Sequence, residues 1–116
     1  MDIRRIDELV HFGPDRMTKV NLFETPRFFC DIYCLLPGQG QSPHTHATND
    51  KVYLVLTGDP TVRVGEEEAR LAPGEAVLAP AGVVHGLSNP TAETVTCLVF
   101  MAPHPRPPAG APNRSA

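Results

Sequence analysis

Three histidines have the residue type and the spacing of a metal site. His44 and His46 are two residues apart in a segment that we expect to be extended, so their side chains point to one face and can reach one ion. His85 lies in a later segment bounded by turns, and a closed barrel would bring it to the same point. Three imidazoles leave positions open for a substrate, as catalytic sites require. The alternative is that an isolated His-x-His pair on a surface strand has no function.

Short apolar runs between proline and glycine turns must position these histidines. A chain of 116 residues has room for one domain. Its 13 prolines and 9 glycines favour short strands over helices. Besides a helical turn near 7–12, we expect strands at 19–24, 28–36, 44–46, 51–56, 61–64, 69–71, 76–79, 83–87 and 94–101. This number of strands, with turns about every 8–12 residues, predicts an all-β barrel or sandwich.

The strand at 28–36 has two faces that alternation separates. Phe29, Asp31, Tyr33 and Leu35 share one face, and Cys30, Ile32, Cys34 and Leu36 share the other. The charge of Asp31 favours the Cys30 face as the inward one.

Net charge, apolar runs and cysteine content argue against several classes of protein. The net charge of −3 and the lack of a basic stripe argue against a nucleic-acid partner. No apolar run has the length of a signal peptide or a membrane span. With three cysteines and no CxxC, we expect reduced, buried thiols in a cytoplasmic protein. Residues 1–102 are predicted to form the barrel domain, and the proline-rich residues 103–116 a disordered tail. His11 and His104 receive no role.

Two segments resemble the two motifs of the cupin superfamily. Residues 38–58, GQGQSPHTHATNDKVYLVLTG, resemble the first motif, in which His-x-His lies between two glycines. Residues 74–89, GEAVLAPAGVVHGLSN, match the second motif at Gly74, Pro80, Gly82, His85 and Asn89. The resemblance implies a small single-domain cupin, a double-stranded β-helix or jelly-roll barrel. It also implies that His44, His46 and His85 bind a divalent metal ion, such as Fe, Mn, Ni or Zn, near the barrel mouth. Single-domain cupins often pair through N-terminal strands, so we expect a homodimer formed through residues 19–24.

Lys51 occupies the position where the first cupin motif usually has a glutamate ligand. Three interpretations are open. The three histidines hold the metal alone, as in thiol dioxygenases of this superfamily. Alternatively, Asp50 reaches the metal although alternation points it to the other face. In the third, the site holds no metal and Lys51 pairs with an anionic ligand.

Lys51 and Tyr53 are the candidate catalytic residues. A lysine beside a metal can bind a carboxylate or enolate, or serve as an acid or base. It can instead lie at the barrel rim with its ammonium in solvent. Tyr53 shares the face of Lys51 and can donate a hydrogen bond to a ligand, although packing is the commoner role of a tyrosine.

These residues predict a metal-binding cupin that acts on a small molecule. A three-histidine dioxygenase is one form of this hypothesis, and an isomerase or decarboxylase of small organic acids is another. The alternative is a ligand-binding or sensor cupin without turnover, since the fold alone does not decide the chemistry.

Overall fold

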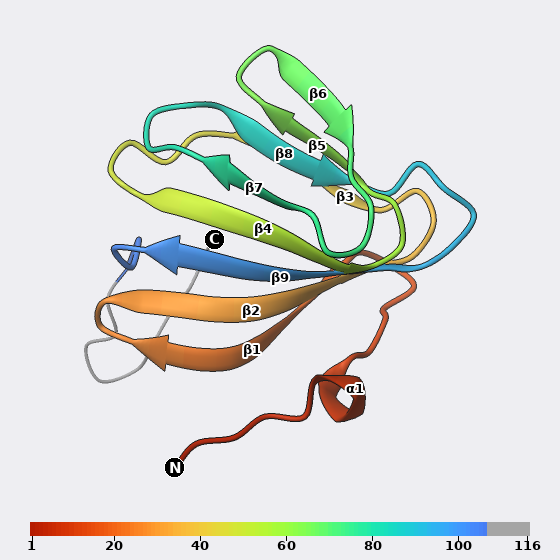
Figure 1. The fold of residues 1–116 in the computed structure, drawn as a ribbon, viewed down its shortest axis with the longest axis horizontal. Helices are drawn as coiled ribbons and strands as arrows, with labels where there is room; N and C mark the ends of the chain where they lie inside the picture. The colour runs from red at the N-terminus through yellow and green to blue at the C-terminus, as the bar shows by residue number, and fades with distance from the viewer. Residues whose placement is uncertain (107–116) are drawn as a thin grey trace.

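The structure, a computed structural model, describes residues 1–106 and contains one short helix and nine strands (Figure 1). In chain order they are α1 (Ile6–Leu9), β1 (Thr18–Thr25), β2 (Phe28–Leu35), β3 (Gly40–His44), β4 (Asp50–Thr57), β5 (Thr61–Val64), β6 (Glu67–Arg70), β7 (Ala76–Ala79), β8 (His85–Ser88) and β9 (Val95–Ala102).

The strands form two antiparallel sheets that face each other (Figure 1). One sheet has the order β1-β2-β9-β4-β7, and the other has the order β3-β8-β5-β6. Strands far apart in the sequence are therefore neighbours, as in a jelly roll. The predicted all-β, double-stranded β-helix fold is confirmed.

The core fills the space between the two sheets. Alternate residues of β2, β4 and β9 point into it, because side chains of a strand alternate between its faces. The fully buried members include Tyr33, Leu35, Val55, Val95 and Val99. Their burial supplies the apolar contact that holds two separate hydrogen-bonded sheets together.

The inward face of β2 is the opposite of the predicted one. Asp31 lies fully buried on the interior side, next to Tyr33 in the strand pattern. The prediction from its charge was wrong because Asp31 has a polar partner on the neighbouring strand, where its Oδ1 accepts a hydrogen bond from Nδ2 of Asn21 at 2.9 Å. The other face, with Cys34, is also buried because α1 and neighbouring N-terminal residues cover it from outside.

The three cysteines are free thiols. Cys97 belongs to the interior core, whereas Cys34 belongs to the cluster outside the sheet and Cys30 is half-buried beside it. Burial raises the pKa of Cys97 to about 12. A thiol that keeps its proton is a poor nucleophile, so Cys97 acts here as a packing residue.

Residues 103–106 pack against one end of the barrel. His104 is buried, and its Nε2 donates to Oε2 of Glu24 at 2.5 Å. Nδ2 of Asn49 donates to the carbonyl of Pro103 at 2.6 Å. Pro103 and His104, which the tail prediction included, thus contact the barrel. The remainder of the predicted tail, residues 107–116, lies outside the described residues.

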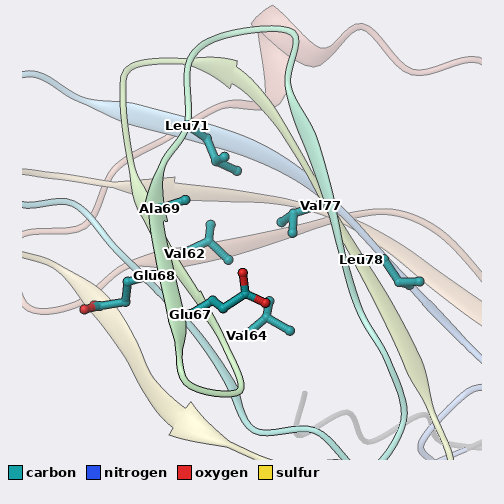
Figure 2. Close-up of a pocket in the computed structure, with 8 residues that line it drawn as sticks. All are labelled: Val62, Val64, Glu67, Glu68, Ala69, Leu71, Val77 and Leu78. Carbon is teal, nitrogen blue, oxygen red and sulfur yellow. The ribbon is translucent and has the colours of Figure 1, made fainter.

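Between β6 and β7, the barrel closes through side chains. Among the described residues, no backbone ladder joins these two strands. An apolar pocket of about 230 Å³ lies there. Figure 2 shows Val62, Ala69 and Val77 directed toward one another, with Glu68 and Leu78 at the margins.

No helix within residues 1–106 is long and apolar enough to cross a membrane.

Candidate metal centre

The structure brings the three predicted histidines together. His44 ends β3 and His85 begins β8, and the two are direct register partners. His46 follows in the next loop, where its carbonyl accepts a hydrogen bond from the backbone N–H of Gly82 at 2.8 Å. One potential ligand atom from each histidine lies within 4.8 Å of the others. Histidines from two distant parts of the chain therefore converge at one point.

The hydrogen bonds of these rings leave the Nε2 atoms available as ligands. Nδ1 of His44 lies 2.9 Å from the carbonyl of Ser42, and Nδ1 of His85 lies 3.2 Å from the carbonyl of Val83. A ring nitrogen facing a carbonyl must carry the proton, so Nε2 holds the lone pair. The Nε2 atoms of all three histidines are buried without a hydrogen-bond partner in the described structure. Such atoms cost free energy unless something binds them, and these three fit a metal ion.

The surroundings keep the three imidazoles neutral. Burial lowers the pKa of each ring, and the positive charge of Lys51 lowers it further. The pKa of His85 falls to about 4. Because a metal binds only the neutral ring, this cluster does not need to lose protons before binding at neutral pH.

Lys51 lies inside the barrel and not at its rim. Its side chain is fully buried, and Nζ lies 3.4 Å from Oε1 of Gln41. Nζ also lies 5.3 Å from the ring centroid of Tyr33 and 5.2 Å from that of Tyr53. Burial lowers the pKa of Lys51 to about 7, the nearby Lys19 lowers it as well, and Asp31 opposes both. The alternative in which the ammonium reaches solvent is therefore wrong.

Tyr53 links the lysine to the histidines. Its ring centroid lies 6.3 Å from that of His85. The side chain is fully buried, and its hydroxyl lacks a hydrogen-bond partner in the described structure. Burial raises the pKa of the phenol, so the hydroxyl keeps its proton and can donate a hydrogen bond to a ligand.

A model of the family described as Cupin domain (Cupin_2) matches residues 31–101, which hold all three histidines and Lys51. This chain belongs to the cupin family. The cupin is similar to a solved structure of TT1209 from Thermus thermophilus, with 48% identity and a TM-score of 0.86 over 89% of this chain and 98% of that one.

Two further proteins are similar to this chain, the first in its fold and the second in its sequence. A Klebsiella pneumoniae protein described as having a double-stranded β-helix domain has a TM-score of 0.81 over 89% of the cupin and 90% of its own chain, at 24% identity. The Streptomyces coelicolor protein SCO3923 is 35% identical over 72 residues, which are 62% of the cupin and 68% of the relative.

In this cupin, Asp50 does not take over from the missing glutamate. Its Oδ1 accepts a hydrogen bond from the backbone N–H of Ala81 at 2.9 Å, on the outward side of β4. Lys51, by contrast, faces inward beside the histidine cluster. The interpretation that needs Asp50 at the metal is therefore not the arrangement found.

Sequence reasoning missed Gln41 as a member of this site. Simple alternation would put Gln41 and His44 on opposite faces. The register between β3 and β8 shifts between these two residues, so Gln41 pairs with Leu87 and His44 with His85, and both face the interior. A bulge of this kind adds one residue to a strand and reverses the alternation beyond it. The proline at 43 was the available signal, since proline within a strand marks an edge or a bulge.

Lys19 was also missed, although its strand was predicted. It pairs with Tyr33 in the register of β1 and β2, and its Nζ lies 5.3 Å from the Tyr33 ring centroid. The interior of this cupin thus combines three neutral imidazoles with Lys51 and two tyrosines, and the exposed Lys19 adds a second cation nearby. That combination can hold a metal ion and an anionic ligand side by side.

Proposed function

We propose that this cupin is an enzyme that binds a divalent metal ion through His44, His46 and His85 and acts on a small anionic molecule. The observation that carries the proposal is the convergence of three buried, unpartnered Nε2 atoms on neutral rings. Fe, Mn, Ni and Zn all accept imidazole ligands. Three protein ligands leave positions on such an ion for a substrate or water.

Dioxygenase chemistry is the form of this proposal that the ligand set favours. A redox metal, when bound, would supply electron transfer and an open position for oxygen, and ligands without charge leave it electrophilic. The residues of the chain bind and orient the substrate. The ammonium of Lys51 holds an anionic group near the cluster, and the hydroxyl of Tyr53 donates a hydrogen bond to a substrate oxygen. The apolar core around them excludes water from the site.

Metal content and turnover test the proposal together. We expect the purified protein to contain close to one equivalent of a transition metal by mass spectrometry. The His85→Ala variant should lose it, and His11→Ala, a change at an exposed histidine outside the site, should retain it. The Fe(II)-loaded protein should consume oxygen with a member of a panel of small carboxylic and thiol-bearing acids. Metal content that is the same in His85→Ala and the wild type would overturn the metal site.

A second candidate function is anion binding without turnover, which the buried ammonium of Lys51 favours. It predicts a protein that binds a small acid equally well with and without metal and consumes none of it. The same panel separates the two functions, because product formation occurs only in the first.

We also propose that the cupin forms a homodimer through β1. This strand lies at the edge of the five-stranded sheet, so one side of its backbone lacks a partner strand within the described part of the chain. An open edge of eight residues invites pairing with a second copy. Light scattering at micromolar concentration should give twice the mass of the chain, and a monomer mass would refute the dimer.

A further inference from the structure

An opening lies at the side of the barrel opposite the apolar pocket, between the edge strands β1 and β3. It has a volume of about 410 Å³, which is within the range of small-ligand sites. Its lining residues are Arg16, Met17, Lys19, Gly40 and Gln41. Neither known motif of the sequence accounts for this opening, because only Gly40 and Gln41 fall inside one.

Gln41 connects the opening to the buried Lys51. Its side-chain oxygen lies 3.4 Å from Nζ of Lys51, which is longer than a good hydrogen bond. An ammonium group carries three donors, and a neutral amide oxygen at this distance satisfies one of them weakly. A buried cation of this kind is costly unless it is paired. The neutral amide of Gln41 therefore supplies Lys51 with no negative charge.

The charges around the opening point the same way. Arg16 and Lys19 line it, and Lys51 lies behind Gln41. Asp31 is the acidic group in this interior, and one of its oxygens already accepts a hydrogen bond from Asn21. The whole chain has a net charge of −3, so this positive region stands out against an acidic molecule and attracts anions from solution.

We propose that the opening between β1 and β3 is a binding site for the carboxylate of a small organic acid, with Lys51 as its specificity-determining residue. The carboxylate enters past Lys19, displaces the side chain of Gln41 from Nζ of Lys51, and forms a charge-assisted hydrogen bond there. The remainder of the acid then extends along Tyr53 toward His85. Only this last orientation depends on the proposed function; the carboxylate site itself does not.

Burial and electrostatics support this assignment. Lys51 has a pKa of about 7, so its charge is only partly retained at neutral pH without a partner. A carboxylate placed beside it restores the charged form, because an opposite charge nearby favours ionisation. The hydroxyl of Tyr53 offers a second, unused donor in the same interior.

Titration of the metal-free protein with simple acids tests the site. The probes are acetate, glyoxylate and pyruvate, with methyl pyruvate as a neutral control, added to EDTA-treated, ¹⁵N-labelled protein. We expect saturable shifts of the backbone amides of Lys19, Gln41 and Lys51 with at least one acid and no saturable shift with the ester. Saturation by the ester with equal affinity, or by none of the acids, would overturn the proposal.

Two variants and a matched control locate the carboxylate. Lys51→Met keeps the shape of the stem, removes the charge and should weaken binding at least tenfold. Gln41→Glu places a carboxylate beside Nζ of Lys51 and should block binding while Lys51 is intact. Arg27→Met removes a cation from the exposed turn between β1 and β2 and should bind within twofold of the wild type. Wild-type affinity in either folded variant, Lys51→Met or Gln41→Glu, would refute the role of Lys51, so one variant is sufficient if the other folds poorly.

The outcome is separable from that of the proposed function. Acid binding is measured without metal, whereas metal content is measured without acid. If the protein binds pyruvate through Lys51 but holds no metal, the carboxylate site stands and the proposed metalloenzyme is refuted. If it holds metal but binds none of the acids, the metal site stands and the carboxylate site is refuted.

Discussion

His44 on β3 and His85 on β8 are opposite each other across one antiparallel ladder, with ring centroids 4.5 Å apart. Backbone hydrogen bonds of the sheet therefore fix the separation of these two rings. A further backbone hydrogen bond, from the N–H of Gly82 to the carbonyl of His46, holds the loop that carries the remaining ring. The metal ligands are positioned by the fold before any ion binds, which lowers the ordering cost of binding.

Acid should destabilise the metal-free protein through His85. Its pKa is about 4 in the fold and about 6.5 in the unfolded chain, so the unfolded chain binds more protons below pH 6.5. Stability is complete above pH 6.5 and falls as the pH drops toward 4, by up to about 3 kcal/mol from this residue. Urea denaturation of the EDTA-treated protein at several pH values, followed by circular dichroism, measures this loss. His85→Phe should flatten the curve, and His11→Phe should leave it unchanged. Parallel curves for wild type and His85→Phe would contradict the lowered pKa.

Replacing Lys51 should change how the free energy of unfolding depends on pH above pH 7. The pKa of Lys51 is about 7 in the fold and 10.5 in the unfolded chain, so above pH 7 the unfolded chain holds the extra proton. The free energy of unfolding of the wild type therefore rises with pH, by up to about 1.4 kcal/mol per pH unit. This gain disappears when the pH returns to neutral. Lys51→Met should lose this rise between pH 7.5 and pH 9. The difference between the two proteins in urea midpoint across this range is the measurement, and a constant difference would argue against burial of the ammonium.

Gly58 and Gly74 give a matched pair that tests the turns of the barrel. Both have positive φ, at 81° and 87°. A Cβ at position 58 would clash with the carbonyl oxygen of Thr94, whereas a Cβ at position 74 meets nothing within 4 Å. Gly74→Ala should therefore cost only the conformational strain of about 1–2 kcal/mol. Gly58→Ala should cost more than about 3 kcal/mol, because the backbone must also move. Equal melting temperatures for the two variants would show that the close approach at Gly58 is absent.

The buried pair of His104 and Glu24 should stabilise the end of the barrel. Nδ1 of His104 accepts the N–H of Arg106 at 2.9 Å, so Nε2 carries the proton that Glu24 accepts. His104→Ala removes both bonds and a ring that packs edge-on against Phe29. We expect a loss of about 2 kcal/mol in the free energy of unfolding, measured by urea denaturation. His11→Ala, at an exposed histidine, should change it by less than about 0.5 kcal/mol.

The residues that repeat along a strand were predictable, and those that depend on register were not. Apolar alternation in 51–56 located β4 and placed Lys51 with Tyr53 on one face, as the structure has them. The two histidine segments were recognised through their motifs. Alternation fails at a bulge, which is why Gln41 was missed.

Burial of polar groups was the second source of error. Asp31 was assigned outward from its charge, although Asn21 on the neighbouring strand donates a hydrogen bond to it. His104 received no role because its proline-rich surroundings indicate a tail, and Glu24 lies far away in the sequence. Each error concerns a partner on a different strand, which local sequence does not specify.

The pocket between β6 and β7 has a mechanical consequence for the barrel. Among the described residues no backbone ladder joins these two strands, and Ala69 of β6 and Val77 of β7 line the pocket together with Val62 of β5. The two strands can separate briefly without breaking a ladder, whereas separation of β2 from β9 would break seven paired positions in a row. Low-cost opening therefore concentrates on this side, and amide hydrogen exchange should reach β6 and β7 long before it reaches the centre of the five-stranded sheet.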